Sequence, residues 1–388
     1  AMQQLPAVTK MVERPRPFEV DLAVLEGMVK ELSVLFKDYK ELFNSNVMLV
    51  AVEQDNYRLT SENVRLKFPL GLVGLTVSAS VRTTDGSTVS DVLAISSLDN
   101  PADLPSIEEL KKKVKDFADN LMELKETPMI EEYYTGPVLF EGGAASRLFT
   151  DNLLSPGRLL ALRTMAPARG MLDEQLGRRI IDSRLTVKNY TTLAEYNGTP
   201  LFGCYEIDGD GVVPAAELTL VENGVFKRML NGRVPTLKAP ESTGSARFMI
   251  SPDNPMAIVS PGTIHVQASK GVGPEKLKKA LLKAAKEADL EYAYIVRRIG
   301  GEASAVYKVN VKDGKEIRVR VNNLSAPELT KLMDLKGISS DERVMNYFPN
   351  GVPASLIYPS AIIVGDVEIN RTTPKIEEEP VLKHPLQR

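Results

Sequence analysis

A twelve-residue acidic segment, EIDGDGVVPAAE at positions 206–217, has the residue types of a calcium-binding loop. On the EF-hand pattern, Glu206, Asp208 and Asp210 would supply the first oxygen ligands, Gly211 the sharp turn and Glu217 the closing carboxylate. An EF-hand loop lies between helices, whereas LFGCY before this segment and LTLVENGVF after it are rich in strand-forming residues. The sequence therefore predicts a tight acidic turn between strands, with calcium binding as the alternative.

Histidine and cysteine are too scarce for the common zinc motifs. His265 and His384 are far apart in the chain, so they cannot form the closely spaced pair of an HExxH helix. Cys204 is the single cysteine, which excludes an internal disulfide and a CxxC zinc site. We interpret His265, in TIHVQA, as structural and Cys204 as a buried inert thiol. If the fold placed Cys204 or Ser245 beside His265, nucleophilic catalysis would be indicated instead.

Composition and charge are those of an ordinary globular protein. The 388 residues are 43% hydrophobic and 26% charged, and the formal net charge is −3. This balance argues against direct nucleic-acid binding, and no apolar run is long enough to span a membrane. The start, AMQQLPAVTK, indicates a cut into a longer protein. The compartment stays open between the bacterial cytoplasm and, if an upstream signal was removed, the periplasm.

The first part of the chain predicts a helix, antiparallel strands and a second helix. Apolar residues recur at helical spacing over residues 18–38. The segments VMLVAVE and YRLTS are predicted strands, and Asp85 and Gly86 form a hairpin turn between GLTVSASVR and VSDVLAI. Ser106 and Glu109 make a capping box that begins the second helix.

From about residue 131 the pattern changes to short strands punctuated by glycine and proline. The predicted strands are RLTVKNYTTL, FGCYEI, AELTLVE, GVFKRML, TIHVQA, YAYIVRRI, YKVNV, IRVRV and SAIIVGDVEI. A helix is predicted from Pro274 to about Leu290, and a shorter one after Ser325 and Glu328. The expected fold is α+β with two domains, residues 1–130 and a strand-rich 131–388 that ends in a loosely held tail, 374–388.

The order of segments resembles the TldD/PmbA family. The resemblance rests on GPVLFEGGAASRLF, RLTVKNYTTL, FGCYEIDGDGVV, LTLVENGVFKRMLNGR, STGSARF and SPGTIHV, and it covers most of residues 18–370. The family comprises bacterial proteins described as zinc-dependent proteases and, in older wording, as modulators of DNA gyrase. The resemblance implies a C-terminal domain of the family type, in which the acidic segment is a hairpin element rather than a calcium loop.

The same resemblance implies that active members bind zinc through a helical HExxxH motif and a cysteine nearer the C-terminus. In SRLFTDNLLSP, Phe149 stands at the first histidine, Thr150 at the glutamate, and Leu153 or Leu154 near the second histidine. The later segment VMNYFPNGVPASLIYPSA contains neither cysteine nor histidine. Zinc is therefore expected in active relatives and not in this chain, which is similar to the metal-free class called PmbA or TldE that pairs with TldD.

The segment STGSARF matches a T-G-x-x-R element of the family through Thr243, Gly244 and Arg247. Its arginine could clamp a peptide carboxylate with two parallel hydrogen bonds, and a structural turn is the alternative.

These observations predict a non-catalytic subunit of a protease-type assembly. It would bind a peptide or an unfolded protein segment and form a homodimer, or a heterodimer with a metal-bearing TldD-like relative. The alternative is a peptidase or amide hydrolase that uses other residues, either Cys204, Ser245 and His265 or a metal held by the acidic segment. Whether the chain is an enzyme therefore stays open at this point.

Overall fold

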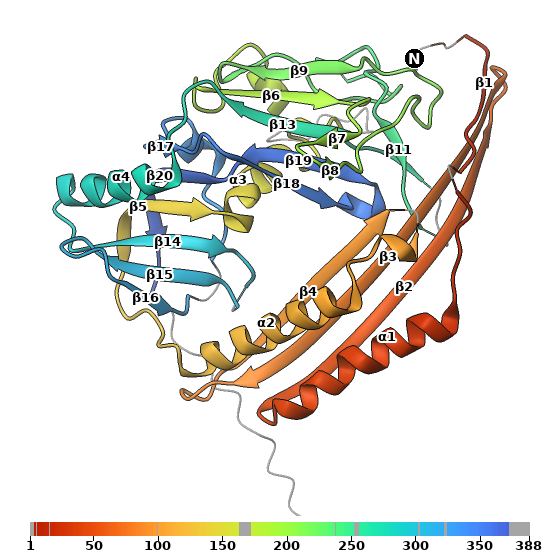
Figure 1. Ribbon diagram of the computed structural model, residues 1–388. Helices are drawn as coiled ribbons and strands as arrows, with labels where there is room; N and C mark the ends of the chain where they lie inside the picture. Colours follow the sequence, from red (N-terminus) through yellow and green to blue (C-terminus); the bar gives the residue numbers. More distant parts are fainter. Residues whose placement is uncertain are drawn as a thin grey trace, which may run out of the picture.

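The α+β fold expected from the sequence is confirmed by a computed structural model (Figure 1). The structure describes residues 4, 6–14, 16–98, 100–162, 172–236, 238–251, 256–301, 303–321 and 324–371. An N-terminal part built on one sheet precedes a C-terminal part built on two larger sheets. The predicted tail, 374–388, and His384 lie outside the described residues.

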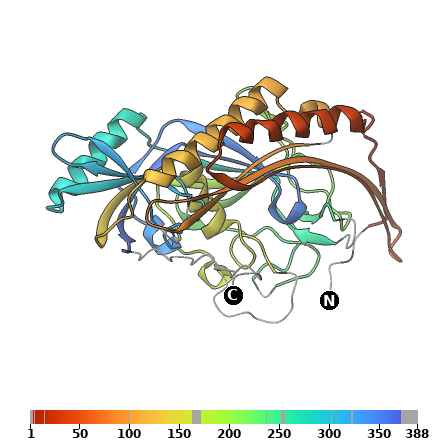
Figure 2. The same cartoon turned by 90° about the horizontal axis from the view of Figure 1, so that it is seen from below.

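The N-terminal part is a four-stranded sheet with two helices on one face. Its elements are β1 (Val8–Met11), α1 (Leu22–Val34), β2 (Leu42–Leu59), β3 (Val64–Arg82), β4 (Thr88–Leu98) and α2 (Ile107–Glu126). Alternate residues of β3, among them Leu75 and Val77, are fully buried beneath the helices. Figure 2 shows α1 and α2 side by side across the strands. The capping box of Ser106 and Glu109 is confirmed, as is the hairpin turn between β3 and β4.

The opposite face of this sheet carries exposed apolar side chains. Met48 and Val50 of β2 and Val92 of β4 are 48%, 41% and 56% exposed. In the strand registers they lie opposite β3 residues that alternate with the residues buried under the helices. Their side chains therefore point to the other face of the sheet. In the described part of the chain, no helix of the N-terminal part lies on this face, and its end at the β2–β3 hairpin packs on the C-terminal part.

The C-terminal part consists of two six-stranded sheets. The first contains, in spatial order, β10 (Val225–Phe226), β9 (Glu217–Glu222), β6 (Leu185–Tyr190), β13 (Thr263–Ala268), β19 (Ala354–Pro359) and β18 (Glu342–Tyr347). The second contains β16 (Glu316–Val319), β15 (Ala305–Asn310), β14 (Tyr292–Arg298), β5 (Tyr134–Glu141), β20 (Ala361–Ile369) and β17 (Gly337–Ile338). Four strands of two or three residues form two small pairs: β11 (Ala246–Phe248) with β12 (Ala257–Val259), and β7 (Glu195–Tyr196) with β8 (Thr199–Pro200).

Two helices pack on these sheets. The short helix α3 (Gly143–Leu153) contacts β5 and β14 of the second sheet and β19 of the first, so it is buried on several sides. Helix α4 (Pro274–Glu287) covers the other face of the second sheet through Leu277, Leu281 and Ala285. The large core between the sheets fixes α3 in place.

Several sequence expectations were wrong in detail. FGCYEI is irregular rather than a strand, because β9 and β13 already occupy both sides of β6. The short helix expected after Glu328 is a 3₁₀ turn, Leu329–Leu332. VMLVAVE and the first three residues of YRLTS, Tyr57–Leu59, belong to the single long strand β2. Helix α3 and strands β18 and β19 were not predicted from periodicity.

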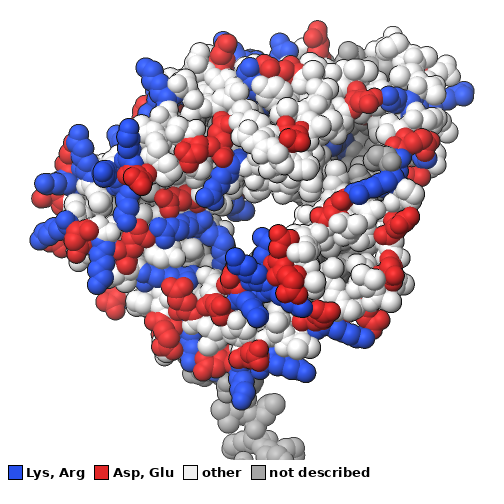
Figure 3. Space-filling view, viewed as in Figure 1, with Lys and Arg blue, Asp and Glu red and all other residues white. Residues whose placement is uncertain are grey.

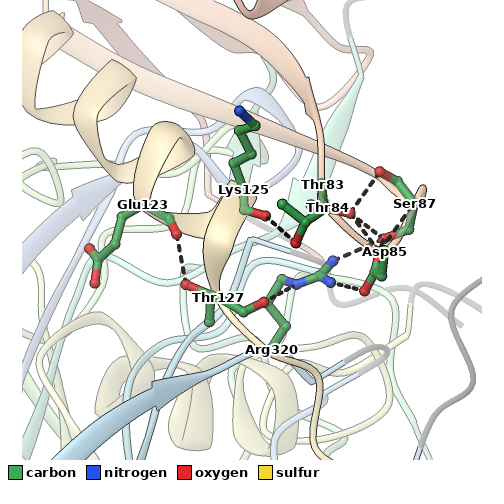
Figure 4. Close-up of polar contacts among 8 residues, drawn as sticks. All are labelled: Thr83, Thr84, Asp85, Ser87, Glu123, Lys125, Thr127 and Arg320. Carbon is green, nitrogen blue, oxygen red and sulfur yellow. Dashed lines mark hydrogen bonds and ion pairs between the residues drawn. The ribbon is translucent and has the colours of Figure 1, made fainter.

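The two parts meet at several places, and two of them lie at opposite ends of the N-terminal sheet. At one, Arg320 after β16 donates hydrogen bonds to the Thr127 carbonyl and the Ser87 hydroxyl, both at 2.9 Å, and pairs with Asp85 (Figure 4). At the other, the tip of the β2–β3 hairpin packs on the acidic segment, with Arg233 2.7 Å from a Glu62 carboxylate oxygen. Figure 3 shows an opening between the two parts, with charged side chains of both signs on its rim.

Candidate functional site

The positions that the resemblance assigns to zinc ligands are occupied by core side chains of α3. Phe149, Leu153 and Leu154 are 1%, 0% and 8% exposed and pack in the main hydrophobic core. Thr150 is half-buried, and its hydroxyl lies 3.1 Å from an Asp151 carboxylate oxygen. Zinc sites are built from cysteine, histidine and carboxylate side chains. The residues at these α3 positions therefore do not fit zinc.

The two segments identified with the metal site nevertheless meet in the fold. Leu154, at the end of α3, and Pro349 and Asn350, from the later segment, line one cavity of about 310 Å³. The rest of that cavity is lined largely by apolar side chains, including Leu160 and Ile258. Within the described ranges, no three His, Cys, Asp or Glu side chains are grouped so that they could hold a metal ion.

The acidic segment directs its carboxylates to partners within the protein. Asp208 is 1% exposed, and its oxygens accept backbone N–H groups from Asp210, Val212 and Ala246 at 2.9, 2.8 and 3.0 Å. Burial raises the pKa of Asp208 to about 6, because these hydrogen bonds only partly offset the desolvation of its charge. An Asp210 oxygen lies 3.3 Å from Arg58 at the hairpin tip.

The remaining acids of this segment are also paired. Glu206 pairs with Lys10 of β1, and Glu217 accepts a hydrogen bond from Lys188 at 2.5 Å. Gly211 has a φ of 90°, and a Cβ there would lie 2.8 Å from Val64. This geometry favours a structural turn that receives the hairpin tip.

His265 is bonded to a carboxylate rather than to a nucleophile. It is 7% exposed, and its Nε2 lies 2.9 Å from Glu342 while its Nδ1 lies 3.3 Å from the Gln267 amide. The Tyr196 hydroxyl donates to the same Glu342 carboxylate. Burial raises the pKa of Glu342, but the hydrogen bonds from His265 and Tyr196 outweigh it and lower that pKa overall.

The structure does not bring the other two candidate catalytic residues to His265. Ser245 is fully buried, and its hydroxyl lies 2.9 Å from that of Thr243. Cys204 is exposed, which corrects the interpretation of a buried thiol, because the segment around it is irregular and lines a cavity. Partial burial raises the pKa of the Cys204 thiol, so little of it is thiolate at neutral pH.

Arg247 lies in the same cavity as Cys204. The cavity has a volume of about 280 Å³ and lies where β3 of the N-terminal part faces β11. Arg247 is 8% exposed, donates to the Pro261 carbonyl at 2.8 Å, and lies over the Tyr205 ring at 4.1 Å from its centroid. Burial lowers the pKa of Arg247, although a guanidinium stays protonated at neutral pH.

Thr243 and Gly244, the other two residues of the T-G-x-x-R element, hold the loop next to Arg247. Thr243 accepts a hydrogen bond from the Asn231 backbone at 2.7 Å, and Gly244 has a φ of 70° that other residues rarely adopt. The Gly244 carbonyl accepts the Tyr205 hydroxyl at 2.9 Å. Sequence reasoning missed the aromatic lining contributed by Phe68, since that residue is remote in the chain and carries no local signal.

Comparisons with known proteins agree with the resemblance seen in the sequence. The family described as "PmbA/TldA metallopeptidase C-terminal domain" matches residues 133–370. No curated protein matches the chain significantly.

Solved structures share the fold at low sequence identity. TldE from Thermococcus kodakarensis has 16% identity and a TM-score of 0.59, covering 94% of this chain and 79% of that protein. A proposed modulator of a DNA gyrase from Thermotoga maritima has 15% identity and a TM-score of 0.59, covering 95% and 80%. A proposed modulator of DNA gyrase from Bacteroides thetaiotaomicron has 14% identity and a TM-score of 0.56, covering 89% and 72%. In the described part of the chain, no helix is long and apolar enough to cross a membrane.

Proposed function

Because the chain belongs to the PmbA/TldD metallopeptidase family, we propose that it is a metal-free member that acts as a non-catalytic subunit. In this role it binds a peptide or an unfolded protein segment and pairs with a second copy or with a metal-bearing relative. The peptide-binding residues are Arg247 and the loop of Thr243 and Gly244 that holds it.

The observation that carries the proposal is that apolar core side chains stand at the α3 positions compared with the metal motif. Phe149 and Leu153 offer no lone pair to a metal, and both are fixed in the core between two sheets. Zinc binding there would need new ligands and a rearranged core, and each buried aromatic or leucine removed from such a core costs several kcal/mol. The same positions therefore stabilise the fold and leave the family's metal chemistry to another subunit.

Exposed apolar side chains on the face of the N-terminal sheet opposite its helices support the partner role. Met48, Val50 and Val92 expose apolar surface on a face without helices. Exposed apolar side chains that share one face are typical of surfaces that bind another protein. We assign the contact with the partner subunit to this face.

Two measurements on protein purified without chelator or added metal test the proposal. Mass spectrometry is expected to find far less than one equivalent of zinc, and the isolated chain is expected to leave unfolded casein uncut. Stoichiometric zinc or proteolysis by the isolated chain would overturn the non-catalytic assignment and revive an enzyme that uses other residues.

The partner role is tested by mixing the chain with a metal-bearing relative and measuring mass in solution, alone and together. Val92→Glu is expected to weaken either kind of dimer, because it places a charge on the proposed contact. Ile317→Glu on β16, which is 54% exposed on the other part of the molecule, is the matched control. Equal effects of the two variants, or a strictly monomeric mixture, would contradict the partner role.

A further inference from the structure

The cavity around Arg247 combines an apolar lining with one buried cation. The N-terminal part contributes Phe68 and Leu70, and the C-terminal part contributes Phe202 and Phe248. The rings of Phe68 and Phe248 lie 5.7 Å apart, so the two parts of the molecule contact each other at this wall. At about 280 Å³ the cavity has room for a side chain and a terminal group of a bound ligand.

The guanidinium of Arg247 uses few of its hydrogen-bond donors within the protein. Within the part of the chain that the structure describes, its one hydrogen bond runs from Nη1 to the Pro261 carbonyl, and the face of the group lies over the Tyr205 ring. A guanidinium carries five N–H donors in a planar fork that matches a carboxylate. Within the described residues Arg247 forms no ion pair, although it is 8% exposed.

The acids beside Arg247 are bonded elsewhere. Both oxygens of Asp208 accept backbone N–H groups, and Glu206 pairs with Lys10. Neither is bonded to the guanidinium. A buried cation whose neighbouring acids are occupied is a site for an anion brought by a ligand, because the charge is then both paired and hydrogen-bonded.

We propose that this cavity binds a carboxylate attached to an apolar group, and that the physiological ligand is the C-terminus of a peptide that ends in an apolar residue. Arg247 would hold the carboxylate, and the last side chain would lie against Phe68, Phe248 and Leu70. The choice of a peptide rests on the proposed function, whereas the carboxylate site rests on Arg247 and the cavity alone. A small free acid with an apolar group shares the same chemistry, and the test separates the two sources.

Cys204 provides a direct probe, since it is the single cysteine and lines the cavity. The experiment measures the rate at which the full chain reacts with a thiol reagent as each ligand is titrated. The probes are Ala-Ala-Phe with a free C-terminus, the same peptide as its C-terminal amide, and 3-phenylpropionate. The free-acid peptide is expected to slow labelling of Cys204 until the rate reaches a plateau. The amide is expected to need a concentration about tenfold higher for the same protection.

Variants connect protection to the guanidinium. Arg247→Gln is expected to raise the half-protecting concentration of the free-acid peptide at least about tenfold, with Arg247→Lys intermediate because it keeps charge but not the fork. Arg179→Gln, which removes an exposed arginine paired with Asp334, is the matched control and is expected to change nothing. If Arg247→Gln does not fold, Arg247→Lys still reports the loss of the fork.

Each outcome has a definite meaning. Protection by 3-phenylpropionate but not by the peptide would keep the carboxylate site and overturn the peptide ligand. Equal protection by acid and amide, or no change in the Arg247 variants, would overturn the site itself. Zinc content and dimer mass do not enter this measurement, so its failure is distinguishable from failure of the proposed function.

Discussion

Replacing Arg320 with methionine tests whether the junction of the two parts depends on one buried guanidinium. The Arg320 side chain is 3% exposed and bonds to the Thr127 carbonyl at the end of α2, the Ser87 hydroxyl and the Asp85 carboxylate (Figure 4). Arg320→Met keeps much of the side-chain volume and leaves all three groups without this donor. The change therefore removes the polar contact and little of the packing.

The expected loss follows from these contacts. Removing one member of a buried ion pair costs about 3–5 kcal/mol. Asp85 is 29% exposed, so water can partly replace the guanidinium there, which favours the lower end of that range. The free energy of unfolding is expected to fall by about 3 kcal/mol.

Urea unfolding at pH 7 measures this loss in a double-mutant cycle with Asp85→Asn. The coupling free energy between Arg320 and Asp85 is expected to be about 1–2 kcal/mol. A loss below about 1 kcal/mol for Arg320→Met, or a coupling that is not measurable, would refute the reasoning. In that case the junction would be held by packing alone.

The acid side of the pH profile gives an independent check on the same contact. Burial raises the pKa of Asp85, but hydrogen bonds from Ser87 and Thr83 and the charge of Arg320 outweigh it and lower that pKa from 3.8 to about 2. A lowered folded-state pKa means stability that is present above the unfolded value and lost as the pH falls through about 4 to 2. The difference between the folded and unfolded pKa values of Asp85 corresponds to roughly 2.5 kcal/mol of stability. Solvent screening at this partly exposed carboxylate reduces that contribution to about 1–2 kcal/mol. Arg320→Met is expected to flatten this part of the profile.

Two further substitutions test contacts elsewhere in the fold. Gly203→Ala is expected to lower the melting temperature markedly or prevent folding, because its Cβ would lie 2.3 Å from the Gly262 carbonyl carbon. An unchanged thermal melt would contradict this steric argument. Arg298→Gln is expected to lower the free energy of unfolding by about 2 kcal/mol, since Asp91 is 6% exposed and accepts two hydrogen bonds from Arg298 at 2.8 and 2.6 Å. Urea unfolding checks this loss, and a change within about 0.5 kcal/mol would contradict it.

The elements that are predicted best from the sequence have one solvent-exposed face and one buried face. Helix α2 carries a buried stripe, a polar face and a capping box, so both the helix and its first residue can be predicted from the sequence. The β3–β4 hairpin is marked by Asp85 and Gly86 between alternating strands. In both cases the local pattern and the tertiary environment agree.

Short elements and fully buried elements could not be predicted from periodicity. Helix α3 has only eleven residues, so its pattern of buried residues with exposed Arg147 and Asp151 runs for too few turns to be distinctive. All six residues of β19, Ala354–Pro359, are buried, so that strand shows no alternation. The resemblance to a family, rather than the pattern, identified the segment of α3.

The candidate site could be predicted only in pieces for a related reason. Arg247 stood out in STGSARF, but its surroundings come from segments that are far apart in the chain, such as those of Phe68 and Phe202. The exposure of Cys204 was also hidden, because it depends on both sides of β6 being occupied by other strands. Local sequence shows which residues could do chemistry, and only the fold shows what they face.

The polar groups of α3 and those around Arg247 differ in how fully they are hydrogen-bonded within the protein. On α3 the buried amide of Asn152 is satisfied by the carbonyls of Leu148 and Pro327, at 2.9 and 2.8 Å, so this helix has its polar requirement met within the chain. Arg247 is as deeply buried, but among the described residues its side chain donates a hydrogen bond to one carbonyl, that of Pro261. A buried charge with spare donors costs stability unless something pairs with it. The cost of burying the Arg247 charge would therefore fall when the carboxylate of a ligand pairs with it, which is the physical basis of the proposed carboxylate site.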